Sequence, residues 1–250
     1  MTIAEQRVLV TGAASGLGLA FAQRLAGRGA RVWALDRDED GLRRAAAEAA
    51  SSDIVFMKCD VGSEEEVAAA VSQIERNSGG ITVLVNNAAV LRDQALVSKL
   101  GKRLRTHSIA DWNETLRSNL TGTFLMARAV AEMMIRGRRH GLIVNVSSIS
   151  RAGNPGQSAY AATKAGIDAL TVTWSQELAT YGIRVVALAP GFVETNMTKT
   201  IPPLFLEQIR LRTPLKRYGT LEEFAHVIEF IVENDYLNGK VLELDGGLRF

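Results

Sequence analysis

The stretch "VLVTGAASGLG", residues 8–18, places three glycines between an apolar run and a segment with helical spacing. Glycines let a backbone turn tightly and approach a pyrophosphate, and free N–H groups at the start of a helix favour an anion. A strand, a glycine-rich turn and a helix in this order predict a dinucleotide-binding site. The residues that we expect to line it are Gly12, Ser15, Gly16, Leu17 and Gly18.

Short apolar runs alternate with helical patterns along the rest of the chain. The runs at 7–10, 31–36, 54–60, 81–87, 142–148, 183–190 and 240–245 are predicted strands. Helical spacing covers 16–28, 39–50, 63–77, 109–136, 157–181 and 220–233. Strands without polar alternation are typical of parallel sheets covered on both faces. We therefore predict an α/β fold: a doubly wound (Rossmann) parallel sheet of seven strands with helices on both faces, in one domain of residues 1–250.

Two long segments lack this pattern. Residues 92–112 are basic and without clear periodicity, so they form either a surface excursion or a segment that shapes substrate entry. Residues 196–219 contain three prolines and follow a strand end, where ligands bind in such sheets. We predict that they form a substrate lid.

Composition excludes several classes of function. The net charge of +2 is too close to balance to indicate a nucleic-acid or membrane partner. Cys59 is the only cysteine, so no internal disulfide is possible and a reducing compartment is expected. The N-terminus lacks a secretory signal, and no apolar run approaches the roughly 18–20 residues of a membrane helix. We expect a cytoplasmic protein without a metal site.

The second and third predicted strands end in acidic residues. Asp36 lies 24 residues after Gly12, where a carboxylate accepts hydrogen bonds from the adenosine ribose and repels a 2′-phosphate. This favours NAD over NADP, although the Arg37 guanidinium could offset the repulsion. Asp36 could instead only cap a helix. Asp60 and Val61 are expected against the adenine.

The fourth predicted strand ends in "NNAA", residues 86–89. We expect Asn86 to tie the strand end to neighbouring backbone. Asn87 and the small Ala88 should line the path of the cofactor.

Tyr160 and Lys164 stand four residues apart in "YAATK". This spacing puts them on one helix face, which is either a structural coincidence or a chemical pair. An ammonium ion beside a phenol lowers the pKa of the phenol and makes it an acid near neutral pH. Ser148, at a strand end, could bind a substrate carbonyl, and Asn119 could hold a water that links Lys164 to solvent.

The motifs "TGAASGLG", "NNAA", "NVSS", "YAATK" and "PGFVET" together resemble the short-chain dehydrogenase/reductase family over essentially the whole chain. The resemblance implies hydride transfer between a nicotinamide and a carbonyl carbon. It also implies a catalytic tetrad of Asn119, Ser148, Tyr160 and Lys164, with Tyr160 and Lys164 also contacting the cofactor. "PGFVET" implies nicotinamide contacts from Pro190, Gly191, Val193 and Thr195.

Three departures from the family pattern matter. Ala89 replaces the glycine of the usual "NNAG", and the 92–112 segment is longer than the common pattern. The usual spacing to the tyrosine selects Ser147, which precedes Tyr160 by 13 residues, whereas the "N-x-S-S" register selects Ser148. We favour Ser148, because a strand end fixes the direction of its side chain.

"GNPGQSAYAATKAG" and "LELDGG" resemble the 3-oxoacyl-thioester reductase branch of this family. The basic cluster 136–140 could meet a carrier protein or the phosphates of CoA, or it is a solvated helix end. Tyr181 stands where members that use carrier proteins often have a basic residue. We therefore favour an NAD-linked 3-hydroxyacyl-CoA dehydrogenase.

Two alternatives stay open: an NAD(H)-dependent dehydrogenase of a small cyclic or aromatic secondary alcohol, and a non-catalytic dinucleotide-binding regulator. The family resemblance also implies a homotetramer, paired through the predicted helices 109–136 and 157–181 and through the last strand.

Overall fold

A parallel sheet of seven strands forms the centre of the computed structural model, which describes residues 1–49, 53–194 and 203–249. Its order is β3-β2-β1-β4-β7-β8-β9. The strands are β1 (Arg7–Thr11), β2 (Arg31–Asp36), β3 (Ile54–Lys58), β4 (Val83–Asn86), β7 (Gly141–Val146), β8 (Ile183–Pro190) and β9 (Val241–Leu244). The doubly wound α/β fold predicted from the sequence is confirmed.

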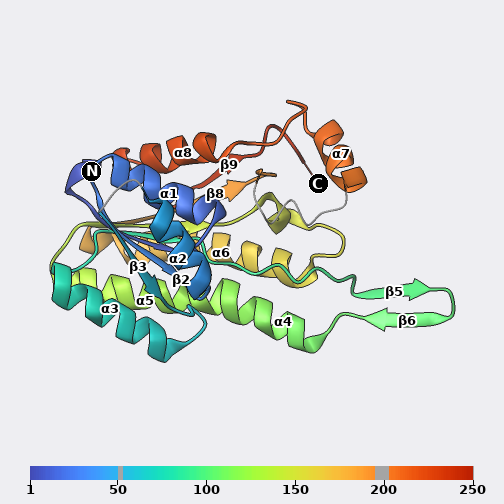
Figure 1. Ribbon diagram of the computed structural model, residues 1–250, viewed down its shortest axis with the longest axis horizontal. Helices are drawn as coiled ribbons and strands as arrows, with labels where there is room; N and C mark the ends of the chain where they lie inside the picture. The colour runs from blue at the N-terminus through green and yellow to red at the C-terminus, as the bar shows by residue number, and fades with distance from the viewer. Residues whose placement is uncertain (50–52, 195–202, 250) are drawn as a thin grey trace.

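Helices cover both faces of this sheet (Figure 1). Their bounds are α1 (Gly16–Gly27), α2 (Glu39–Glu48), α3 (Glu64–Ser78), α4 (Ile109–Thr115), α5 (Gly122–Arg136), α6 (Ser158–Glu177), α7 (Pro203–Arg212) and α8 (Leu221–Glu233). The short turns are η1 (Ile3–Glu5), η3 (Ile149–Ala152) and η4 (Ala179–Tyr181). None of these helices is long and apolar enough to cross a membrane.

Alternate residues of each strand point into two separate cores. Val8 and Val10 belong to the core beneath α1 and α8, together with Phe21 and Phe224. Leu9 belongs to the opposite core, which α3, α5 and the end of α6 cover. Because both faces are buried, the strands need apolar residues at nearly every position, which explains their continuous apolar sequences.

Local signals place the ends of the helices that flank the sheet. Ser63 caps α3 by accepting a hydrogen bond from the Glu66 N–H, and Gly79 ends that helix with a φ of 73°. Thr220 and Glu223 form a capping box at the start of α8. Each helix therefore begins or ends where the chain must return to the sheet.

The strand order reverses between β1 and β4, so the chain departs in opposite directions from these neighbours. Ligands of open parallel sheets bind in the crevice beyond the carboxyl ends of such strands. The glycine-rich turn follows β1 at this crevice. The fold therefore places the predicted cofactor site at the carboxyl edge between β1 and β4.

The predicted helix 109–136 is divided. A π-helical segment, η2 (Leu116–Thr121), separates α4 from α5. Such π-helical insertions are often found at functional sites.

Residues 92–112, whose sequence shows no clear periodicity, contain two strands that the sequence did not predict. They contain an antiparallel hairpin of β5 (Val97–Leu100) and β6 (Arg103–Thr106), which projects far from the sheet (Figure 1). Gly101 turns the chain with a φ of 61°, as tight hairpin turns require. The β6 residues are exposed, as are Val97 to Lys99 of β5, so no face had to be apolar and the sequence shows no alternation.

The predicted lid 196–219 contains α7, but residues 195–202 lie outside the described residues. Its role as a lid stays a prediction, as does the assignment of residues 1–250 to one domain.

Candidate active site

The turn after β1 presents the start of α1 to the crevice. Gly12 and Gly16 have positive φ values of 65° and 58°. A Cβ atom on Gly18 would lie 2.2 Å from the carbonyl oxygen of Gly12, so only glycine fits there. Among the described residues, the N–H groups of Gly16, Leu17 and Gly18 have no hydrogen-bond partner, and Ser15 makes no side-chain cap. Such a helix start fits the pyrophosphate of a dinucleotide.

Asn87 fastens this turn to the end of β4. Its Nδ2 donates to the carbonyl oxygens of Thr11 and Gly12, both at 3.0 Å, and the Thr11 hydroxyl accepts from the Asn87 and Ala88 N–H groups. We expected Asn86 to make the contact to neighbouring backbone, and this was wrong. The buried Asn86 side chain donates to the Asn145 side chain in the neighbouring strand at 3.0 Å. It faces away from the Asn87 side chain because adjacent strand residues point to opposite faces of a sheet.

Asp36 lies at the end of β2, beside the same turn. Its Oδ2 accepts from the Ala14 N–H and its Oδ1 from the Asp38 N–H, both at 3.0 Å. The helix cap of α2 is Asp38, which accepts from Gly41. Asp36 is therefore not the cap of this helix. The Asp36 carboxylate instead lines the crevice beside the glycine-rich turn.

The neighbouring charges form an ion-pair network. Arg37 pairs with Glu114 at 2.8 Å, Glu114 pairs with Arg117, and Arg117 reaches Asp60 at 2.9 Å. These arginines hold the pKa of Glu114 at about 2, with hydrogen bonds as the main cause. The positive charge of Arg37 is thus partly neutralised. Val61, beside Asp60, is buried and contacts the start of α5.

Tyr160 and Lys164 meet as the helical spacing predicts. The Lys164 Nζ lies over the Tyr160 ring, 5.5 Å from its centroid, and donates to the Val146 carbonyl oxygen at 2.6 Å. Lys164 is only 2% exposed. The last residue of β7 thus fixes the buried ammonium group.

The pKa of Tyr160 differs from the sequence-based expectation. Burial raises it to about 12, opposed by a hydrogen bond with Ser148 and assisted by the charge of Asp93. Burial also lowers the pKa of Lys164 to about 8, against the attraction of Asp168. The expected lowering by Lys164 is absent because the ammonium group lies over the ring face and desolvation dominates. At neutral pH, Tyr160 is a protonated phenol and Lys164 an ammonium ion.

The two candidate serines point in different directions. The Ser148 side chain lies against the Tyr160 phenol and accepts from the Ser150 N–H at 3.1 Å. The Ser147 hydroxyl donates to the backbone oxygen of Lys164 at 3.3 Å. Geometry therefore favours Ser148 as the group that faces a substrate.

Asn119 lies in η2 and is completely buried. Its side chain accepts from the Val90 N–H at 2.7 Å and donates to the Val90 carbonyl oxygen at 2.9 Å. The expectation that Asn119 holds a water that links Lys164 to solvent stays a prediction. Asn119 holds the chain that leaves β4 beside the crevice.

The segment after β8 completes the crevice. Pro190 ends β8, and a Cβ on Gly191 would lie 2.7 Å from the Cα of Asp245, so the backbone packs tightly there. Val193 is buried and pairs with Gly219 in an isolated bridge. Thr195 lies outside the described residues.

The basic cluster 136–140 is not at this site. It precedes β7, whereas Ser148 follows that strand. Six residues of strand separate the two edges by about 20 Å. The cluster therefore lies at the opposite edge of the sheet from the predicted substrate entrance.

Comparisons with known proteins agree with this geometry. A family model described as enoyl-(acyl carrier protein) reductase matches residues 12–249. A 3-oxoacyl-[acyl-carrier-protein] reductase FabG from Thermotoga maritima is 41% identical, over 96% of each chain. The 3-hydroxyacyl-CoA dehydrogenase type-2 of Homo sapiens is 37% identical, over 96% of this chain and 94% of that protein.

The chain belongs to the short-chain dehydrogenase/reductase family. A solved structure from Agrobacterium tumefaciens, described as a candidate gluconate dehydrogenase, superposes with a TM-score of 0.88 and 31% identity, over 97% of this chain and 95% of that one. As a member of this family, the chain is an oxidoreductase that acts on CH–OH groups.

Sequence reasoning missed the residues that join the hairpin to this short-chain dehydrogenase site. Gln157, three residues before Tyr160, donates to Asp93 at 2.8 Å and forms a bridge with Gln94. Gln94 in turn donates to Asp111 at 2.5 Å. The only signal was a group of polar residues at both ends of the long segment.

The buried charge of Lys164 should make the folded protein less stable below pH 8 than above pH 10.5. Below pH 8, Lys164 is charged in both the folded and the unfolded protein, so folding must remove a charge from water. Above pH 10.5, it is neutral in both, and this cost disappears. Lys164→Met should raise the free energy of unfolding at pH 7 by about 2 kcal/mol, because the shift is worth about 3 kcal/mol and the lost bond to Val146 offsets about 1 kcal/mol.

The gain should shrink between pH 8 and pH 10.5, as the folded wild type loses its proton. Urea unfolding from pH 6 to pH 10 measures it. Lys240→Met, at an exposed position, is the control. An unchanged gain at pH 10 would show that the charge of Lys164 is not its source.

Proposed function

We propose that this protein is an NAD(H)-dependent oxidoreductase that interconverts a 3-oxoacyl and a 3-hydroxyacyl thioester, with CoA as the thiol. The observation that carries the reaction is the meeting of Ser148, Tyr160 and Lys164 beside the glycine-rich turn. The names of the two relatives support the acyl-thioester substrate.

The residues of the site divide the reduction of a ketone among them. A nicotinamide held in this crevice would supply the hydride. The Tyr160 phenol donates its proton to the carbonyl oxygen, and its raised pKa keeps that proton available at neutral pH. Ser148 holds the same oxygen by a hydrogen bond. Lys164, fixed by Val146, provides positive charge beside the phenol and binds the nicotinamide ribose.

The adenosine end supports NAD. Asp36 presents a carboxylate beside the turn, and Arg37 is paired with Glu114. A 2′-phosphate would therefore meet a negative charge without an unpaired arginine to balance it. Asp60 and Val61 line the adenine side, and Asn87 and Ala88 line the middle of the crevice. Pro190, Gly191 and Val193 would hold the nicotinamide, and Thr195, outside the described residues, stays a predicted contact.

The hairpin supports a substrate with phosphate groups. Lys99, Lys102, Arg103 and Arg105 are exposed on it, and no acidic residue occurs between Asp93 and Asp111. None of these four forms an ion pair within the described part of the chain. The base of the hairpin is fixed to Gln157, three residues before Tyr160, and its strands project outward from there (Figure 1). We propose that these cations bind the phosphates of a CoA that extends outward from the site.

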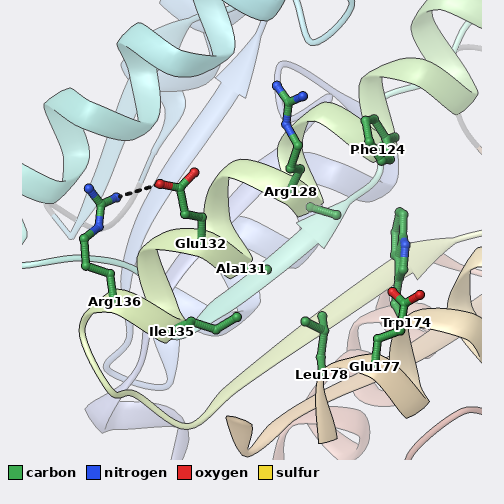
Figure 2. Close-up of a pocket in the computed structure, with 10 residues that line it drawn as sticks. Phe124, Arg128, Ala131, Glu132, Ile135, Arg136, Trp174, Glu177 and Leu178 are labelled. Atoms are coloured by element: carbon green, nitrogen blue, oxygen red, sulfur yellow. Dashed lines mark ion pairs between the residues drawn. The ribbon is translucent and has the colours of Figure 1, made fainter. Parts of the chain in front are cut away.

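A groove lies between α5 and α6 (Figure 2), and we propose a second copy of the chain as its occupant. The groove has a volume of about 480 Å³ and an apolar floor that includes Phe124, Trp174 and Leu178. Its rim carries two arginines and two glutamates, and such balanced charge suits a two-fold interface between identical faces. The rim residues are Arg128, Glu132, Arg136 and Glu177. We propose a homotetramer that uses this face and the last strand; a cytoplasmic location agrees with the free, buried Cys59.

NAD(H) should be preferred over NADP(H) by at least about tenfold in kcat/KM, since a tenfold ratio requires only about 1.4 kcal/mol of repulsion. Asp36→Ala should narrow this ratio, measured with both cofactors. Asp38→Ala, which removes a nearby carboxylate that caps α2, should leave it unchanged. Equal use of both cofactors by the wild type would contradict the preference.

Tyr160→Phe should reduce kcat by at least about a thousandfold, within the usual range for a general acid. Binding of NADH, measured by fluorescence titration, should stay nearly unchanged because only the transferable proton is lost. Ser148→Ala should slow turnover far more than Ser147→Ala, its matched neighbour. A larger effect at Ser147 would reverse the assignment.

Lys99→Glu/Arg103→Glu should lower kcat/KM for a 3-oxoacyl-CoA by at least about tenfold, or about 1.4 kcal/mol. The same acyl group on N-acetylcysteamine, which lacks phosphates, should be reduced at the wild-type rate. Arg138→Glu, in the opposite basic cluster, is the control. Equal losses with both thioesters would contradict phosphate recognition.

Light scattering should give a mass well above the 27.1 kDa of one chain. Phe124→Asp, at a position 41% exposed in the monomer, should lower that mass by placing charge in the groove. Tyr236→Asp, at a fully exposed position, should not. An active monomeric wild type would contradict the proposed assembly.

A further inference from the structure

A third ionisable residue stands on the helix face that carries Tyr160 and Lys164. Asp168 follows Lys164 by four residues in α6, so its side chain lies over the same face one turn further along. It is part-buried, with a side chain 20% exposed. The reaction derived above uses no group at this position.

Arg151 holds Asp168 from the segment that follows Ser148. Its Nε lies 2.8 Å from the Oδ2 of Asp168, and its Nη2 lies 2.5 Å from the Oε1 of Glu243 in β9. Charges of alternating sign thus extend from Lys164 through Asp168 and Arg151 to Glu243. Arg249 continues the series, because it pairs with Glu243 at 3.1 Å.

The Asp168–Arg151 ion pair leaves polar atoms of both side chains without hydrogen bonds among the described residues. The Oδ1 of Asp168 and the Nη1 of Arg151 are buried and have no hydrogen-bond partner among the described residues. The nearby Ser147 hydroxyl has one proton, and its geometry directs that proton to the Lys164 carbonyl oxygen. The Asp168 carboxylate therefore lies part-buried one helical turn from the Lys164 ammonium group, where its charge can act on that group.

We propose that Asp168, held by Arg151, is a positioning residue that keeps Lys164 in its ammonium form inside the buried site. The charge coupling is a property of the folded chain alone. Its effect on turnover rests on the proposed function.

The other charges around the pair agree with this role. Asp168 raises the pKa of Lys164 against the larger effect of burial. Burial raises the pKa of Asp168, whereas Ser147, Arg151 and Lys164 lower it and Glu243 raises it. Tyr160 on the same helix, with Asp93 beside it, completes the ionisable groups that face Lys164. Removing Asp168 should therefore bring the deprotonation of Lys164 into the neutral range.

The first experiment measures stability without any cofactor. Asp168→Asn should destabilise the protein more at pH 6 than at pH 10, because the attraction exists only while Lys164 is charged. This difference should vanish in the Lys164→Met background. Asp168→Glu, which keeps the carboxylate, should retain most of the stability that Asp168→Asn loses. Glu243→Gln should change the free energy of unfolding by the same amount at pH 6 and at pH 10. A loss from Asp168→Asn that is the same at both pH values would overturn the proposal.

The second experiment measures the pH profile of ketone reduction. Reduction by the wild type should decline as pH rises through the pKa of Lys164, at about 8. Asp168→Asn should move this decline to lower pH. Arg151→Gln, which removes the residue that holds Asp168, should move it in the same direction and gives a test if Asp168→Asn does not fold. Glu243→Gln should leave the decline at its wild-type pH. Declines that stay at the wild-type pH in both Asp168→Asn and Arg151→Gln would overturn the proposal.

The two experiments separate the hypotheses. If no ketone is turned over, the proposed function fails, but the stability comparison still decides the role of Asp168. If turnover follows the proposed function and the stability loss is independent of pH, only the role of Asp168 is wrong.

Discussion

All strands of the main sheet run in one direction, and the site depends on this constraint. Parallel strands bring all their carboxyl ends to one edge, so segments distant in sequence meet there without any special connection. The reversal of strand order opens the crevice, and two hydrogen bonds between Thr11 and Asn87 join the strand ends on its two sides. The glycine-rich turn, Asp36 and Ser148 then need only to follow their strands to stand around the same space.

The site concentrates groups that a stable core would exclude. Lys164 is buried as a cation and donates to a backbone carbonyl oxygen, and one carboxylate oxygen of Asp168 has no hydrogen-bond donor among the described residues. The surrounding strands must supply the stability that these groups remove. Their fully apolar interiors, at Val8, Leu9 and Val144 for example, are suited to that task.

The parts that could be predicted from the sequence are those fixed by local geometry. The spacing of Tyr160 and Lys164 on a helix determines their common face, and the apolar runs determine the strands. The contact to neighbouring backbone was assigned to Asn86, although Asn87 makes it. The error arose because a shift of one residue at a strand end reverses the direction of the side chain. The cluster 136–140 and Ser148 both adjoin β7, but at opposite ends of it. Their separation therefore became clear only once the bounds of β7 were known.

Electrostatic quantities were the least predictable part. Two residues in a sequence show which charges can meet, but not how far each is removed from water. Burial therefore reversed the expected shift of Tyr160, and the pairing of Arg37 with Glu114 appeared only in three dimensions. The hairpin escaped prediction for the opposite reason, since strands that bury no face leave no hydrophobic pattern.

The hairpin is an appendage that begins and ends at almost the same point of the scaffold. The carbonyl oxygen of Leu96 accepts from the His107 N–H, and β5 and β6 pair with each other rather than with the main sheet. Its length and charge can consequently change through insertion, deletion or exchange without disturbing the packing of either core. An ancestral enzyme with this scaffold could therefore acquire a new range of substrates at its entrance while the residues that perform the chemistry stayed the same.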